Sequence, residues 1–160
     1  MSENSHSLSC YIEAPRFVGS EIKADLHADF YEGAGGEKPT NIIRCDQTAC
    51  VEVTIDFGGC ELARLLCLKW CVKVAFEGCG SALEGSLPVK WVEQRVCESK
   101  VVKVKIDIPA NYFPCNEAEC GDVYMLCVSV LASDTCGNPA PFAGYCKGGS
   151  IMVYPPSRGK

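Results

Sequence analysis

Cysteines are the residues of this chain whose type and spacing could do chemistry, and there are 13 of them in 160 residues. Four form two C-x4-C pairs, in the stretches RCDQTAC and PCNEAEC: Cys45, Cys50, Cys115 and Cys120. Four thiolates brought together from two loops make a tetrahedral zinc site, and this spacing is at the edge of the known range. Local disulfides, within the pairs or between them, fit the same spacing. We expect no cofactor, with zinc at these four cysteines as the alternative.

A second candidate site is a row of polar side chains in the alternating segment 22–30. Asp25, His27 and Asp29 share one face of this segment and offer oxygen and nitrogen ligands to a cation. A solvated sheet face gives the same pattern and is more common. Nothing near His27 in the sequence marks a catalytic cysteine, and the chain contains no nucleophile elbow, Walker loop or dinucleotide fingerprint. We therefore expect a protein that is not an enzyme.

Other thiols are placed to cross-link molecules. The stretch LLCLKWCVKVAFEGCG predicts a strand over residues 66–76, with Cys67 and Cys71 on the face that also carries lysines. These two cysteines lie four residues apart, about 13 Å between Cα atoms at about 3.3 Å per residue, whereas a disulfide needs about 7 Å or less. They cannot bond each other, so any bond goes to a neighbouring strand, a loop or another chain.

Two further cysteines extend this set. Cys127 has a similar outward position on its predicted strand, and Cys10 ends a polar arm that could reach a neighbouring subunit. The simpler interpretation of any single cysteine is a small buried apolar residue, but packing alone seldom calls for so many thiols. The predicted intermolecular cross-links use Cys10, Cys67, Cys71 and Cys127.

The candidate side chains named above are predicted to lie on or beside β-strands, because apolar and polar residues alternate along much of the chain. The predicted strands cover residues 22–30, 50–57, 66–76, 88–92, 101–109, 122–133 and 150–154. A turn or short helix is predicted at 58–66, and no long helix is indicated. About seven or eight strands separated by turn residues predict an all-β protein: a single antiparallel β-sandwich, immunoglobulin-like or jelly-roll. Trp70 belongs to its core face.

The chain divides into three parts. Residues 1–15 are predicted to form a flexible N-terminal arm, residues 16–155 the sandwich domain, and residues 156–160 a polar tail. A chain of this length buries about 70% of its unfolded surface on folding, so disulfides are not forced by small size.

Composition excludes several partners and locations. The net charge is −5 with no basic run, so we expect no nucleic-acid binding, and no apolar run approaches the roughly 18 residues of a membrane span, so we expect no membrane insertion. No leader sequence is recognisable, which predicts synthesis in the cytoplasm without a signal peptide. So many cysteines are nevertheless typical of oxidising places. We therefore expect the final location to be an extracellular, spore-surface or cell-surface assembly.

The function most consistent with these features is structural. We expect a self-assembling subunit of a filament, appendage or surface layer, stabilised by disulfides within and between copies, with its own copies as partners. One alternative is a cytosolic thiolate-zinc protein. Another is a carbohydrate-binding or adhesive module whose groove aromatics are Tyr31, Trp91, Tyr112 and Tyr145.

Overall fold

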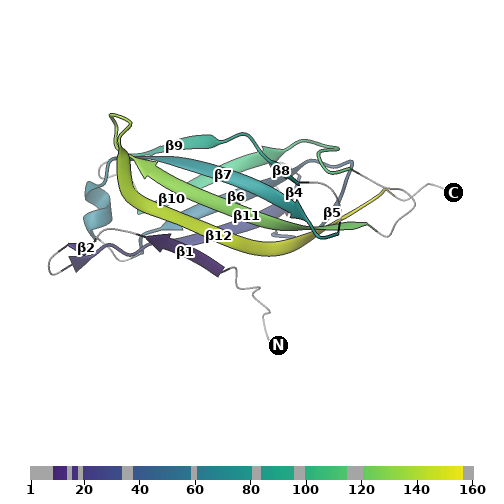
Figure 1. Ribbon diagram of the computed structural model, residues 1–160, viewed down its shortest axis with the longest axis horizontal. Helices are drawn as coiled ribbons and strands as arrows, with labels where there is room; N and C mark the ends of the chain where they lie inside the picture. Colours follow the sequence, from purple (N-terminus) through teal and green to yellow (C-terminus); the bar gives the residue numbers. More distant parts are fainter. Residues whose placement is uncertain are drawn as a thin grey trace.

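Two β-sheets packed face to face form the body of the protein. The computed structural model describes residues 9–13, 16–17, 20–33, 38–58, 61–80, 84–95, 100–114 and 121–156. In Figure 1 the larger sheet lies in front of the smaller one. The predicted all-β sandwich is confirmed.

The larger sheet has seven strands. They are β1 (Ser9–Glu13), β5 (Ile42–Arg44), β7 (Leu68–Gly78), β8 (Glu84–Ser86), β9 (Lys90–Gln94), β11 (Asp122–Ser133) and β12 (Pro139–Tyr154). Their order is β1-β12-β11-β7-β8, with β5 also paired to β12 and β9 also paired to β7. The strands β7 and β11 are therefore central, and every outward residue of their middle parts has neighbours on both sides.

The smaller sheet has three strands in the order β10-β6-β4. Their bounds are β4 (Asp25–Glu32), β6 (Ala49–Asp56) and β10 (Val101–Ile108). A short ribbon of β2 (Arg16–Phe17) and β3 (Ser20–Glu21) and a 3-10 helix, η1 (Glu61–Leu65), complete the described elements. The helix falls inside the segment predicted as a turn or short helix.

Alternation along the strands produces the core. On β6, Val51, Val53 and Ile55 are fully buried, while the outward Glu52 and Thr54 keep partial exposure. Burial of each such aliphatic side chain contributes about 1.5–3 kcal/mol. Because the strands facing β6 alternate in the same way, the two inner faces form one continuous apolar layer.

Trp70 lies at the centre of this layer, on the face predicted from the sequence, and is 0% exposed. Its ring packs against Phe57 and Phe142, with centroids 6.2 and 6.0 Å away. The indole Nε1 donates a 2.9 Å hydrogen bond to Oε1 of Gln94, a buried polar side chain on β9. Gln94 Nε2 is buried and has no hydrogen-bond partner among the described residues. The indole N–H of Trp70 therefore has an acceptor, whereas the amide nitrogen of Gln94 has no acceptor among the described residues.

Several details differ from the sequence-based expectations. Ser9–Glu13, placed in the N-terminal arm, forms β1 and pairs antiparallel with β12. β12 begins at Pro139, well before the predicted strand 150–154, and is long and bent because its register with β11 shifts twice. One strand pair, β5 with β12, is parallel. Residues 1–8, 14–15 and 157–160 of the predicted arm and tail lie outside the described residues.

Candidate functional site

The thiols fall into distinct chemical states. Cys45 and Cys146 are disulfide-bonded. The free thiols among the described residues are Cys50, Cys67, Cys71, Cys79, Cys127 and Cys136. The side chains of the other five cysteines lie outside the described part: Cys10, Cys60, Cys97, Cys115 and Cys120. For Cys10 the backbone is described, and it pairs in register opposite Cys146.

Two of the predicted cross-linking thiols occupy the outer face of the larger sheet. Cys71, on β7, pairs in register with Leu131 of β11 on one side and with Trp91 of β9 on the other. Cys127, on β11, pairs with Ala75 of β7. Both residues are half-buried, and both thiols are free.

The third, Cys67, lies just outside the strand that was predicted to contain it. β7 begins at Leu68, so Cys67 is in the short link after η1, where it is exposed and free. Since Cys71 is free as well, the two are not bonded to each other, as the spacing required. Cys10 cannot be placed in this way, because its side chain is not described.

The sequence did not single out two more accessible thiols. Cys79 follows β7, and its N–H donates a 2.7 Å hydrogen bond to the Val123 carbonyl. Cys136 lies in the turn between β11 and β12. Both are exposed and free. Their positions just beyond alternating segments were the available signal, since residues beyond a strand end are usually exposed.

A hollow of about 470 Å³ opens beside Cys71. Trp91 and Leu131 line it, together with Pro139, Pro141 and Phe142 from β12, so its wall is mainly apolar. The ammonium of Lys69 lies 5.3 Å from the centroid of the Trp91 ring, a cation–π contact. The half-buried thiol of Cys71 therefore sits at the edge of an apolar depression.

The four-cysteine zinc proposal meets one obstacle in the structure. The sulfur of Cys45 is in a disulfide and is not a thiolate in this state. Cys50 is 1% exposed and free, and Cys115 and Cys120 lie outside the described residues. In the described part of the chain, no three His, Cys, Asp or Glu side chains gather closely enough to hold a metal ion.

The polar row on the first predicted strand is present as expected. Asp25, His27 and Asp29 are exposed on the outer face of β4, where they pair in register with Asp56, Thr54 and Glu52 of β6. They form part of a charged sheet face rather than a convergent cluster.

The aromatic residues proposed as a ligand groove are not brought together. Tyr112 packs into the core against Phe76 and Phe113, with centroids 5.9 and 5.1 Å away. Trp91 lines the hollow, whereas Tyr145 is exposed on β12. A shared carbohydrate platform of these side chains is therefore absent from the described residues.

Cys50 is expected to be the slowest of the described free thiols to react. It lies on the outer face of β6 yet is buried, and burial raises its pKa, with Asp107 and Glu52 adding to the rise and Lys105 opposing it. Only the thiolate attacks an alkylating agent. We expect iodoacetamide at neutral pH to label the other five thiols first and Cys50 only after unfolding, as read by peptide mass mapping. Early labelling of Cys50 in folded protein would contradict its burial.

The turn that carries Cys136 is closed by Asp134. Asn138 donates to this carboxylate from its side chain and its backbone N–H, at 2.9 and 2.8 Å, and the Cys136 N–H donates at 2.9 Å. These hydrogen bonds, led by the Asn138 side chain, lower the pKa of Asp134. Because the folded pKa lies below the unfolded one, the stabilisation is present above the unfolded pKa and disappears as pH falls through the folded pKa.

We therefore expect Asn138→Ala to raise the pKa of Asp134 towards its ordinary value, measured by NMR titration of the carboxyl carbon. Asn111→Ala, in a different loop, is the control. An unchanged Asp134 titration in the Asn138 variant would show that the turn is held by other contacts.

Within the described ranges, no helix has both the length and the apolar character needed to cross a membrane. The described surfaces are of two kinds. The smaller sheet has a charged outer face, and the larger sheet carries accessible thiols and an apolar hollow. Neither a protein-family model nor a curated protein matches this chain, so its function must be inferred from these surfaces.

Proposed function

We propose that this protein is a non-enzymatic structural subunit that self-assembles into a filament, appendage or surface layer and is cross-linked through surface thiols. One observation carries the proposal. The described free thiols that are not buried are Cys67, Cys71, Cys79, Cys127 and Cys136, and all five lie on β7 and β11, at their ends or in the turn after β11. The described free thiol of the smaller sheet, Cys50, is buried. The described accessible thiols therefore all belong to the larger sheet or to the links at the ends of its central strands.

The spacing of these thiols favours bonds between molecules. Cys127 lies four residues along β11 from Leu131, which is the register partner of Cys71. The Cα atoms of Cys71 and Cys127 are therefore about 14 Å apart, from about 13 Å along the strand and about 4.8 Å across it. A disulfide closes at about 7 Å or less, so within one subunit these two thiols stay apart. Another molecule can supply the missing partner.

The chemistry is thiol–disulfide exchange. A thiolate of one subunit attacks a low-molecular-weight disulfide, such as oxidised glutathione, and a small thiol leaves. The thiol of a second subunit then attacks the protein sulfur of this mixed disulfide and releases the second small thiol. Two protein thiols lose two electrons and two protons, and the small disulfide takes up both. An oxidising location supplies the reagent.

Electrophoresis of the native material tests the proposal. The protein is alkylated at the moment of lysis to block exchange, separated with and without reductant, and viewed by negative-stain electron microscopy. We expect a ladder or a polymer too large to enter the gel, which collapses to monomer with reductant. Monomer in both lanes, without any assembly in the images, would refute it. Stoichiometric zinc in the purified protein would favour the thiolate-zinc alternative.

A further inference from the structure

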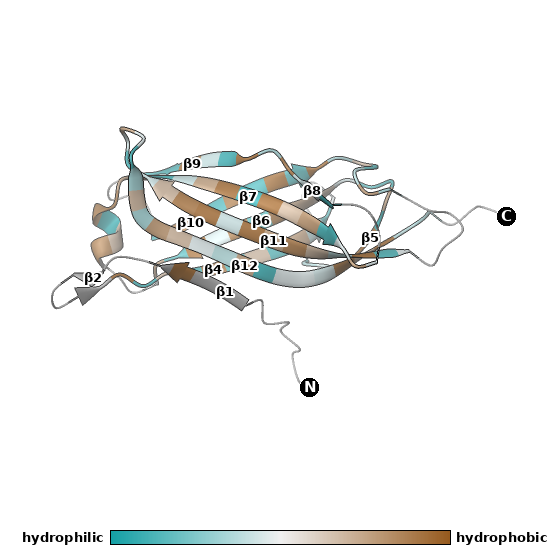
Figure 2. Ribbon diagram, in the orientation of Figure 1, coloured by the Kyte–Doolittle hydropathy of each residue, from teal (hydrophilic) through white to brown (hydrophobic). Residues whose placement is uncertain are grey.

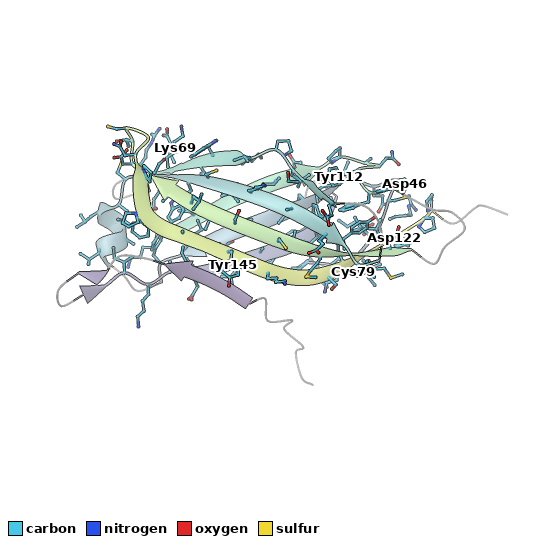
Figure 3. The ribbon with its side chains drawn as sticks, in the orientation of Figure 1. Asp46, Lys69, Cys79, Tyr112, Asp122 and Tyr145 are labelled. Carbon is cyan, nitrogen blue, oxygen red and sulfur yellow. The ribbon has the colours of Figure 1, made fainter. Side chains whose placement is uncertain are left out.

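A pocket of about 450 Å³ opens at the end of the larger sheet where β7 begins and β9 ends. The turn between β11 and β12 contributes Thr135 to its wall. Unlike the hollow beside Cys71, this pocket is lined by charged residues: Lys69, Glu93 and Arg95. Figure 3 labels Lys69 at this end of the sheet, and Figure 2 shows hydrophilic residues at both ends of β9. Pockets of this volume take small molecules.

A buried amide without a hydrogen-bond acceptor belongs to the wall of this pocket. Gln94 lines the pocket and is 4% exposed. The indole N–H of Trp70 is only a donor, so Oε1 of Gln94 is the amide atom that faces it, at 2.9 Å. Nε2 is the other end of the same amide, and it has no acceptor among the described residues. Since buried donors are normally paired, an oxygen of a bound molecule is the partner that this amide lacks.

Cys67 adds a reactive group to the same wall. Its thiol is exposed and free, and Cys67 directly precedes β7. The pairing of β7 with β9 ends at Leu68 and Gln94, and Cys67 and Arg95 are the next residues along each strand. The thiol, the guanidinium and the buried amide therefore come from adjacent positions and line one small pocket.

The charges of the wall match a small peptide disulfide. Arg95 lies 3.4 Å from Glu93, but the two side chains are 68 and 62% exposed, and such an ion pair is weak enough to open for a ligand. Oxidised glutathione carries carboxylates, ammonium groups and amide carbonyls around its S–S bond. Lys69 and Arg95 suit its carboxylates, and Glu93 suits an ammonium group. Nε2 of Gln94 suits a carbonyl oxygen.

We propose that this pocket binds a small peptide disulfide of the glutathione type and that Cys67 forms a mixed disulfide with it. The Cys67 thiol loses its proton to solvent, and the thiolate attacks one sulfur of the bound disulfide. The S–S bond of glutathione breaks, and Cys67 bonds to one of its sulfurs. The other glutathione leaves as a thiolate, which takes up a proton. The inference rests on the exchange chemistry of the proposed function, and it names the thiol that reacts first and the molecule that it meets.

Competition between thiols of one molecule tests the site. Dilute reduced protein is treated with less than one equivalent of oxidised glutathione, quenched with acid and digested with pepsin for mass mapping. We expect Cys67 to take up glutathione about tenfold or more faster than Cys136, which is also exposed and free but lies outside the pocket. Bis(2-hydroxyethyl) disulfide has the same reactive bond without charges, and with it the preference should be largely lost. A preference of equal size with both reagents, or with neither, would overturn the proposal.

Two double variants with the same change in net charge test the cations. Lys69→Gln with Arg95→Gln removes both cations of the pocket, whereas Lys73→Gln with Lys147→Gln removes two from elsewhere on the larger sheet. All four residues are exposed, and circular dichroism checks that both proteins are folded. We expect the first variant to lose the preference for glutathione at Cys67 and the second to keep it. An unchanged preference in the first variant would overturn the site.

The amide of Gln94 reports on the bound molecule directly. In ¹⁵N-labelled protein, we expect its side-chain NH₂ signals to shift more when Cys67 carries glutathione than when it carries mercaptoethanol. Signals unmoved in both adducts would overturn the contact assigned to Gln94.

The outcomes also separate this site from self-assembly. A preference for Cys67 in protein that stays monomeric after oxidation would support the site and refute the proposed function. Cross-linked protein without that preference would overturn the site alone.

Discussion

Replacing Trp70 with alanine is expected to lower the free energy of unfolding by about 3–5 kcal/mol. The side chain is 0% exposed and fills the space between Phe57 and Phe142 at the centre of the sandwich. Its removal also takes away the only described hydrogen bond of the Gln94 side chain, whose second amide group already lacks a partner. Because a domain is stable by only about 5–15 kcal/mol, this one change threatens the fold. Urea denaturation followed by circular dichroism, with all thiols reduced, measures the loss.

The second tryptophan supplies the control. Trp91 is 56% exposed and borders the hollow, so Trp91→Ala is expected to cost about 0.5 kcal/mol or less. Trp70→Phe keeps an aromatic ring but not the indole N–H, and its smaller loss isolates the hydrogen bond to Gln94. Equal destabilisation by Trp70→Ala and Trp91→Ala would contradict the assignment of Trp70 to the core.

The buried face of each long strand was predictable because alternation is a local property. Alternation along the predicted strand 50–57 puts Val51, Val53 and Ile55 on one face, and they are fully buried. The same reasoning placed Trp70 in the core. A polar residue at every second position leaves only one face that can be buried, so strand identity and orientation follow from a few consecutive residues.

Strand pairing was not predictable because it depends on distant partners. β12 starts at Pro139 in a stretch of prolines and glycines that locally favours a loop, yet β11 and β1 supply hydrogen-bonding partners on both sides. Ser9–Glu13 has no such signal by itself and becomes a strand by pairing with β12. The parallel position of β5 also has no local signature.

Thiol accessibility was only partly predictable for the same reason. Alternation puts Cys50 and Cys127 on outer faces alike, but Cys50 is 1% exposed and Cys127 keeps partial exposure. Which outward residue is covered depends on the segments that pass over the sheet. Composition leads to cross-linking as a hypothesis, but it does not predict which thiols are accessible.

Removing the accessible thiols is expected to abolish covalent assembly without unfolding the protein. The variant carries serine at five positions: Cys67, Cys71, Cys79, Cys127 and Cys136. Serine is close in size to cysteine, and at exposed or half-buried positions its hydroxyl can bond water, so we expect stability to change by about 0.5 kcal/mol or less per site. On non-reducing electrophoresis after oxidation, the ladder of wild type should be lost.

Cys50→Ser is the matched control, with the opposite pattern expected. A hydroxyl at this buried position, without a partner, costs about 1–3 kcal/mol, whereas the accessible thiols and therefore the ladder remain. The comparison separates the thiols that we propose for assembly from the buried thiol of Cys50. A ladder that persists in the five-serine variant would show that the cross-links use other cysteines, and Cys10→Ser would then be the decisive variant. In that case the larger sheet would be a surface that carries thiols without using them for assembly.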